Sequence, residues 1–193
     1  MSTTDRDLPP PRDLDVPVGA LVQELAALLG VDATVGLCLD LLAGADRRDH
    51  VVELPYLTGL TFEPGSPRLE PHRWPDHWVR TWGARGLLHV WSEDATGPVV
   101  AGLADEHWRP AEMCLKVSTR RELGQAGPGA CALLGHPLPR VRGQALRTLG
   151  AAGDTEHVAA VRRALDDPHP DVRRHAGRAL ERMSDRLDLD APW

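Results

Sequence analysis

Tryptophan residues recur at helical spacing near the middle of the chain. Trp74, Trp78 and Trp82 lie four residues apart, and residues at this spacing share one face of a helix. Arg80 and Arg85 are close in sequence. Such a cluster can stack a nucleic-acid base or hold a partner protein. The interpretation favoured for Trp78 and Trp82 is structural, namely that they cover the first repeat and seat the N-terminal helices on it. The alternative aromatic site comprises Trp78, Trp82, Arg80 and Arg85.

Histidine is frequent, with nine residues, but its spacing does not predict a metal site. The chain contains no HExxH motif and no clustered His and Cys residues. The His residues are therefore interpreted as surface or capping residues, and we expect no metal ion.

Cysteine and glycine patterns also give no sign of catalysis. Cys38, Cys114 and Cys131 form no CxxC motif, which favours buried free thiols and a reducing, cytoplasmic compartment. The glycine-rich segment 124–130 lacks the Lys–Ser/Thr pair of a phosphate-binding loop. We therefore predict no catalytic residue and no cofactor, although a cryptic enzymatic activity stays open.

Composition narrows the choice of partner. No stretch approaches the 18 apolar residues of a membrane span, and we expect no membrane partner. The net charge of −6 argues against broad nucleic-acid binding. All but one of the 22 basic residues are Arg, a bias that a GC-rich genome explains.

The elements that must position these residues are helical repeats. Four segments align at a spacing of 31 residues, beginning at Val79, Pro110, Val141 and Val172. Small residues occupy one equivalent position of the repeats, namely Gly83, Cys114, Ala145 and Ala176. Apolar residues occupy two other equivalent positions. Each repeat then comprises two helices, A and B. Helix A is expected near 78–90, 110–121, 140–150 and 171–183, and helix B near 94–104, 126–134 and 155–166.

This pattern resembles the HEAT-repeat family, and more closely its short-period branch named after phycobilisome lyases. The resemblance covers about 78–183 and rests on the following residues: Val79–Arg80, Val141–Arg142, Val172–Arg173, the DDPHPDVR run at 166–173, Ala145–Leu149 and Ala176–Leu180. It implies a right-handed α-solenoid that acts as a scaffold. It also implies that Arg80, Arg142 and Arg173 bond to turn carboxylates or carbonyls of adjacent repeats. The second repeat departs from the pattern, since Gly127, Pro128 and Gly129 predict a short or distorted helix B.

The regions outside the repeats are predicted from composition. Residues 1–17 are acidic and Pro-rich and are expected to be disordered. Residues 18–75 are expected to form a helical cap and a long loop. In the cap, one helix runs from Val18 to Gly30, Asp32 caps a second, and Asp46 opens a third that Pro55 disturbs at its end. Repeats follow at 76–183, and an acidic tail at 184–193.

Charge along helix B suggests a binding face. Ala101, Ala132 and Arg163 occupy equivalent positions of successive repeats and form one row of side chains. Val100, Cys131 and Arg162 form the neighbouring row. If these rows line a groove, it is apolar at one end and basic at the other, which suits an acidic amphipathic segment. That segment can belong to a partner protein, or to the leader or tail of this chain.

The sequence therefore predicts an all-α solenoid of HEAT-like helix pairs with an N-terminal helical cap. Its expected function is that of a non-catalytic module that binds a protein or peptide through Arg162, Arg163, Ala132, Ala101 and Val100. The alternative is a nucleic-acid-binding or DNA-repair protein that uses the Trp and Arg cluster. The oligomeric state stays open.

Overall fold

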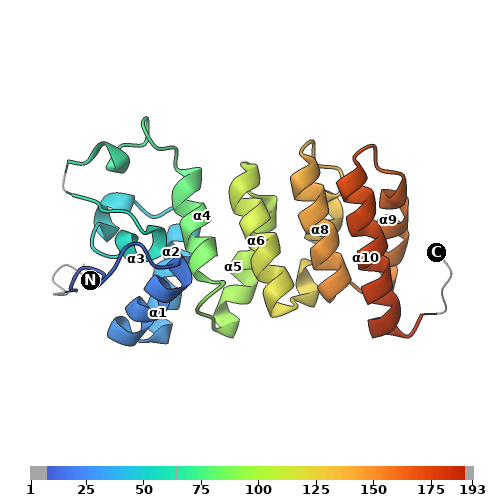
Figure 1. Cartoon of the computed structure of the whole chain (residues 1–193), viewed down its shortest axis with the longest axis horizontal. Helices are drawn as coiled ribbons and strands as arrows, with labels where there is room; N and C mark the ends of the chain where they lie inside the picture. The colour runs from blue at the N-terminus through green and yellow to red at the C-terminus, as the bar shows by residue number, and fades with distance from the viewer. Residues whose placement is uncertain (1–7, 64, 190–193) are drawn as a thin grey trace. The chain divides into compact units, whose positions relative to one another are not determined.

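The computed structural model describes residues 8–63 and 65–189, and the regular secondary structure in this part of the chain is entirely helical (Figure 1). The chain divides into two compact units, up to Ala95 and from Thr96 onward. The boundary falls inside the first repeat expected from the sequence. The predicted helix A of that repeat, α4 (His77–Gly86), therefore belongs to the first unit.

Two apolar helices open the first unit. α1 (Val18–Leu29) ends at Gly30, as its sequence predicts. α2 (Val31–Leu42) begins directly afterwards, with Gly30 as its N-cap in a left-handed conformation of φ 88°. The prediction that Asp32 caps this helix is wrong, because Asp32 lies within the first turn. There its charge complements the helix dipole. α2 packs against α4.

The predicted third helix of the cap is two separate elements. A 3₁₀ turn, η1 (Arg47–His50), follows Asp46, whose side chain accepts a hydrogen bond from the Arg48 backbone N–H at 2.9 Å. α3 (Leu54–Thr58) then carries Pro55 in its first turn. Pro55 therefore helps to start a helix and does not disturb the end of one, because the missing N–H costs nothing at that position.

The loop between α3 and α4 is bound by a buried arginine side chain of the first unit. It contains one 3₁₀ turn, η2 (Pro67–Leu69). Arg47, only 2% exposed, donates hydrogen bonds to the carbonyl oxygens of Arg68 and Trp74 and pairs with the Asp76 carboxylate. Because these bonds reach three points of the loop, Arg47 fixes its path.

Part of the segment expected to be a disordered leader has defined contacts. The Tyr56 hydroxyl donates to the carbonyl oxygen of Pro9 at 2.6 Å. The Arg12 backbone N–H donates to Glu24 on α1 at 3.3 Å. Residues 8–17 thus lie against the first unit, whereas residues 1–7 lie outside the described residues.

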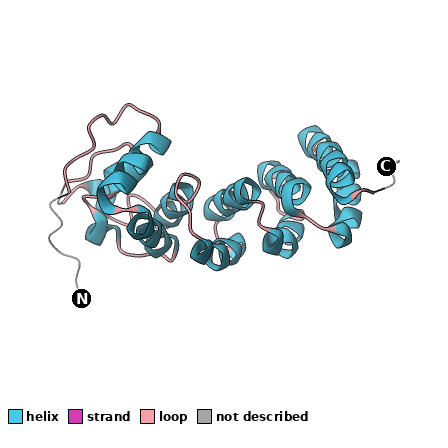
Figure 2. Ribbon diagram, turned by 90° about the horizontal axis from the view of Figure 1, so that it is seen from below, coloured by secondary structure: helices cyan, strands magenta, loops and turns pink. Residues whose placement is uncertain are grey.

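Long and short helices alternate in the second unit. The long ones are α6 (Trp108–Arg121), α8 (Pro139–Ala152) and α10 (Pro170–Leu187). They correspond to the predicted A helices and begin one or two residues earlier. α10 also includes residues 184–187 of the expected tail, of which residues 190–193 lie outside the described part. Seen in Figure 2, the long helices form one layer of this unit and the short ones form the other.

The short helices correspond to the predicted B helices. They are α5 (Thr96–Ala101), α7 (Gly127–Leu133) and α9 (Val158–Arg163). The 3₁₀ turns η4 (Gly102–Ala104), η5 (Gly124–Ala126), η6 (Thr155–His157) and η7 (Ala164–Asp166) adjoin them.

The predicted distortion of the second repeat does not single out α7. It has seven residues, whereas α5 and α9 have six each. Its Pro128 lies in the first turn, where proline is tolerated. A Cβ at Gly127 would lie 2.5 Å from the His157 ring, and one at Gly129 would lie 2.7 Å from Leu103. The glycines therefore permit close packing.

The core of the second unit lies between its two layers. α8 packs against α6, α7 and α10. The small residues predicted at one repeat phase, Cys114, Ala145 and Ala176, are completely buried. Gly150 brings α8 and α10 close together, because a Cβ there would lie 2.9 Å from the Ala179 Cα. Stacked pairs thus bury a continuous core that a single pair lacks.

Candidate functional site

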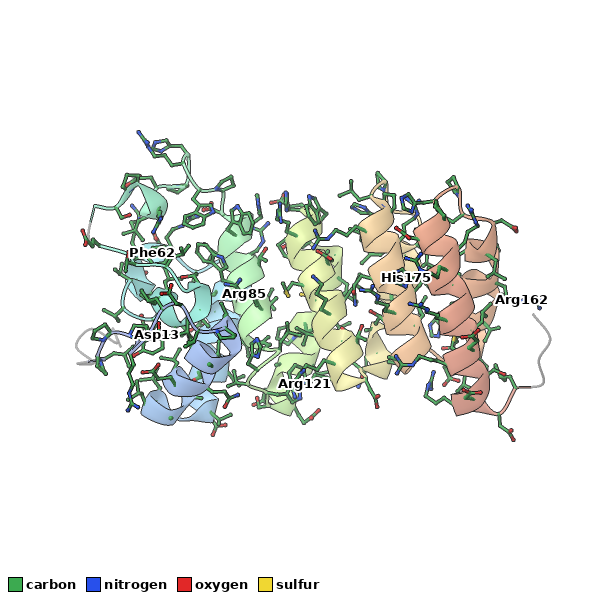
Figure 3. All side chains as sticks on the ribbon, viewed as in Figure 1. Asp13, Phe62, Arg85, Arg121, Arg162 and His175 are labelled. Carbon is green, nitrogen blue, oxygen red and sulfur yellow. The ribbon has the colours of Figure 1, made fainter. Side chains whose placement is uncertain are left out.

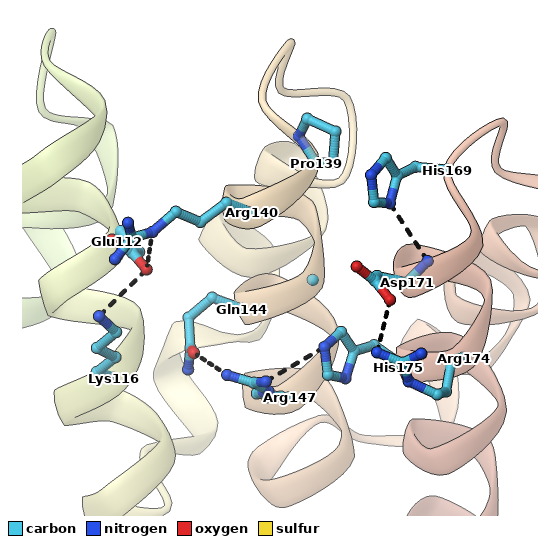
Figure 4. A pocket seen from close by; sticks show the side chains of 11 residues that line it. Glu112, Lys116, Pro139, Arg140, Gln144, Arg147, His169, Asp171, Arg174 and His175 are labelled. Carbon is cyan, nitrogen blue, oxygen red and sulfur yellow. Dashed lines mark hydrogen bonds and ion pairs between the residues drawn. The ribbon is translucent and has the colours of Figure 1, made fainter.

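A groove of about 600 Å³ opens on the outer face of α6, α8 and α10 in the second unit (Figure 4). Four cationic and two acidic side chains are prominent in its lining: Lys116, Arg140, Arg147, Arg174, Glu112 and Asp171. Three consecutive repeat helices contribute to this one hollow. The pairing of the charges decides which cations are available to a ligand.

At the α6 end of the groove, one carboxylate serves two cations. Glu112 is buried and accepts from Lys116 Nζ at 3.1 Å and from Arg140 Nε at 2.8 Å. The Arg140 guanidinium also lies 5.3 Å from the centre of the Trp108 ring. Both cations at this end are therefore already engaged with a carboxylate.

At the α10 end, Arg174 pairs with Asp171 at 2.6 Å, one helical turn away. The Asp171 backbone N–H donates to Nδ1 of His169, the N-cap residue of α10. His107 and His136 accept backbone N–H groups in the same way at other turns. These contacts agree with the capping role predicted for the histidines.

Arg147 lies at the centre of the groove and has neutral partners. It donates to Gln144 Oε1 at 3.1 Å and to His175 Nε2 at 3.2 Å. Gln144 is itself held from the core, because its Nε2 donates to Thr119 Oγ1 at 3.2 Å, which in turn donates to the Leu115 carbonyl. These bonds tie Gln144 to α6 and thereby fix the direction of Arg147. Figure 4 shows the bonds of Arg147 to Gln144 and to His175.

His175 must be neutral to make its contact with Arg147. A guanidinium group only donates hydrogen bonds, hence Nε2 of His175 accepts and the ring proton resides on Nδ1. Burial lowers the pKa of His175, and the nearby charges of Arg147, Arg174 and Arg178 lower it further, while Asp171 acts in the opposite direction. The neutral form is thereby favoured at neutral pH.

The partner-binding residues predicted from the sequence lie in the other layer. Arg162, Arg163, Ala101 and Ala132 are exposed, and Val100 is half-buried. None of the five lines the groove. Figure 3 shows His175 on the face of α10 that borders α8, and Arg162 at the outer edge of α9. The two rows of side chains therefore belong to two different surfaces.

The sequence reasoning missed the groove, although one pattern points to it. Lys116, Arg147 and Arg178 follow one another at the repeat spacing of 31 residues. Extending the comparison of rows from helix B to helix A would have found them. The pairing that separates Arg147 from its neighbours depends on contacts between helices, which the spacing does not reveal.

The Trp cluster is part of the first unit's packing. Trp82 is 3% exposed, and its ring centre lies 5.0 Å from that of Trp74 and 6.0 Å from that of Phe62. Trp78 makes an edge contact with Trp74. These rings join the loop to α4, and the burial of Trp82 removes it from any open stacking surface.

The arginines of the same cluster also lie on α4. Arg85 donates to the Leu57 carbonyl, and burial lowers its pKa. Arg80 is half-buried. The structure therefore brings Trp78, Trp82, Arg80 and Arg85 onto one helix without forming an open site from all four.

The cysteines show no sign of reactivity. Burial raises the pKa of Cys38 and of Cys114 to about 12, which holds both as thiols. Burial also raises the pKa of Cys131. All three are free. Within residues 8–63 and 65–189, no group of three or more metal-ligating side chains comes together.

Arg142 and Arg173 form contacts of the kind that the family resemblance implies, and the expectation for Arg80 stays a prediction. Arg142 binds both oxygens of Asp167, at 2.7 and 2.8 Å, and also the carbonyl oxygens of His136 and Pro137. Arg173 binds the equivalent carbonyls, those of Asp167 and Pro168. Arg142 thus joins two successive repeats, and the Asp167 carboxylate it holds has a lowered pKa.

Comparison with known proteins agrees with this architecture. Among the described helices, none is both long and apolar enough to cross a membrane. A search of curated proteins finds no significant match to the chain. Residues 127–191, a segment that includes α7 to α10, match the family model of HEAT repeats. The closer resemblance to the branch named after phycobilisome lyases stays a prediction. The helix pairs, their stacking and this match show that residues 127–191 are similar to HEAT repeats, in agreement with the resemblance seen in the sequence.

Proposed function

We propose that this protein is an interaction module that binds a segment of a partner protein in the groove of α6, α8 and α10. The observation that carries the proposal is that three consecutive repeat helices line one continuous groove of about 600 Å³. HEAT repeats commonly mediate protein interactions. The cysteines Cys38, Cys114 and Cys131 form no disulfide. Free thiols support a location in the cytoplasm, which is a reducing compartment.

The charges in the groove favour a protein segment over nucleic acid. Glu112 and Asp171 lie in its lining, among the cations. A polyphosphate backbone would meet both carboxylates, whereas a peptide can present a different side chain at each point. The chain's net charge of −6 adds to the repulsion of a polyanion.

The exposed face of the short helices is the second candidate surface. Ala101 and Ala132 lie on α5 and α7, and Arg162 and Arg163 lie on α9. Val100 lies beside this row, half-buried. The mixture of small apolar and cationic side chains supports binding of an acidic amphipathic segment, as the sequence suggests.

Two steric variants distinguish the surfaces. Gly143 lines the groove, and a Cβ there would lie 2.9 Å from the His175 ring, so Gly143→Leu fills the groove at the expense of a movable side chain. Ala132→Leu adds the same bulk to the exposed face of α7. Circular dichroism on both variants checks that the helices are retained.

Peptides selected by phage display against the full chain provide the probe. We expect Gly143→Leu to weaken their binding about tenfold, which is about 1.4 kcal/mol, and Ala132→Leu to leave it unchanged. Loss of binding only in Ala132→Leu would assign the site to the short helices. Failure to select any peptide, together with binding of a DNA duplex that weakens steeply between 50 and 200 mM salt, would replace the proposal with the nucleic-acid function.

A further inference from the structure

Arg147 differs from the other cations of the groove in its partners. Lys116 and Arg140 share the Glu112 carboxylate, and Arg174 pairs with Asp171. Arg147 contacts the neutral side chains of Gln144 and His175, and no carboxylate of the described residues forms an ion pair with it. A ligand anion at Arg147 therefore displaces no ion pair of the protein.

The Arg147 guanidinium is also oriented before any ligand arrives. Gln144 is 5% exposed and is tied through Thr119 to the backbone of α6. His175, which lies on α10, accepts a hydrogen bond from the other terminal nitrogen of the Arg147 guanidinium. A guanidinium has five N–H donors, and these two bonds leave the others for a ligand. Because its side chain is already ordered, less conformational entropy is lost on binding.

We propose that the groove takes an acidic segment of a partner protein, and that one Asp or Glu carboxylate of this segment pairs with Arg147. The inference rests on the proposed function and names the partner's chemistry. Arg178 lies near His175 and adds positive charge around the same point, whereas the charge of Arg174 is paired with Asp171. A singly charged carboxylate suits the site, because Arg147 provides the one positive charge of the groove that no carboxylate of the described lining pairs with.

Gln144 is a positioning residue in this account. It does not provide charge to the ligand, but it fixes one nitrogen of Arg147. Gln144→Leu should therefore weaken binding of an acidic peptide less than Arg147→Gln does. In the double variant, the effect of the Gln144 substitution should disappear, because there is no longer a guanidinium to orient.

The test uses fluorescence anisotropy with the full chain at low salt. The probe is a labelled peptide of about twelve residues in which Glu alternates with Ser and Leu, and its control has Gln at every Glu. The protein variants are Arg147→Gln and Arg182→Gln. Arg182 is a matched control, since it is exposed on α10 and does not line the groove.

We expect Arg147→Gln to weaken binding of the Glu peptide about tenfold, and Arg182→Gln to change it by less than about twofold. The Gln peptide should bind weakly to every variant. Equal binding of the Glu and Gln peptides, or unchanged binding by Arg147→Gln, would overturn the inference.

The two proposals fail in different ways. If peptides from display bind and are lost in Gly143→Leu but not in Arg147→Gln, the groove is an interaction site and the assignment of an acidic partner is wrong. If neither the selected peptides nor the Glu peptide bind at the groove, both proposals are wrong.

Discussion

The two layers of the second unit use their side chains differently. α6, α8 and α10 have 14, 14 and 18 residues, and polar side chains on them bond from one helix to the next. α5, α7 and α9 have six or seven residues and carry exposed alanines and arginines. Long parallel helices can order side chains across several turns, which is what a selective groove needs. The shorter layer mainly completes the core.

The largest effect should follow from forcing the long helices apart. Gly150→Val places a branched side chain against the Ala179 backbone and should destabilise the protein by about 2 to 3 kcal/mol. Chemical denaturation followed by circular dichroism measures the change.

Gly177→Ala on α10 is the matched control for this substitution. A Cβ at Gly177 meets no atom within 4 Å, and alanine should stabilise the helix by roughly 0.5 to 1 kcal/mol. Effects of the same sign in both variants would contradict the close packing of α8 on α10.

A smaller difference should separate two arginines at the same repeat position. Arg142→Ala removes a largely buried ion pair with Asp167 as well as two carbonyl bonds and should cost about 2 kcal/mol. Arg173→Ala removes only bonds to carbonyls on an exposed side chain and should cost about 1 kcal/mol. Denaturant midpoints of the two variants compare them directly, and equal losses would mean that the Asp167 pair adds nothing.

The smallest effect should appear as a pH dependence of stability. The folded-state pKa of His175 is below its usual value of 6.5, mainly because of burial. The unfolded chain then binds the proton more readily. Stability is therefore complete above about pH 6.5 and falls as the pH decreases from there to the lowered pKa.

His175→Gln should flatten this part of the profile, because glutamine can accept from Arg147 without titrating. Free energies of unfolding at several pH values between 5 and 8 measure it for both proteins. A slope that is the same in the variant would mean that other groups cause it.

The repeat spacing predicted the long helices well. A period of 31 residues places small residues where α6, α8 and α10 contact one another. These close contacts admit only small side chains, so the pattern is visible in the sequence. Helix starts were less predictable. Asp32 and Pro55 both occur in the first turn of a helix, and their residue types alone do not tell a cap from an early helical position.

The groove was less accessible from sequence than the fold. The sequence shows that Lys116, Arg147 and Arg178 recur at the repeat spacing. It does not show which of these cations form ion pairs with carboxylates. Glu112 neutralises two cations from different helices, and only the packing of α6 against α8 brings them together. The neutral partners of Arg147 are Gln144 on α8 and His175 on α10, and only the packing of these helices brings them together.

Photocrosslinking tests the central claim most directly. A peptide selected by display and carrying a photoreactive group is bound to the full chain, irradiated, and the modified residues are located by mass spectrometry. We predict crosslinks to α6, α8 and α10, near Lys116 and Arg147. Crosslinks concentrated on α5, α7 and α9, near Ala132 and Arg163, would contradict the assignment of the groove.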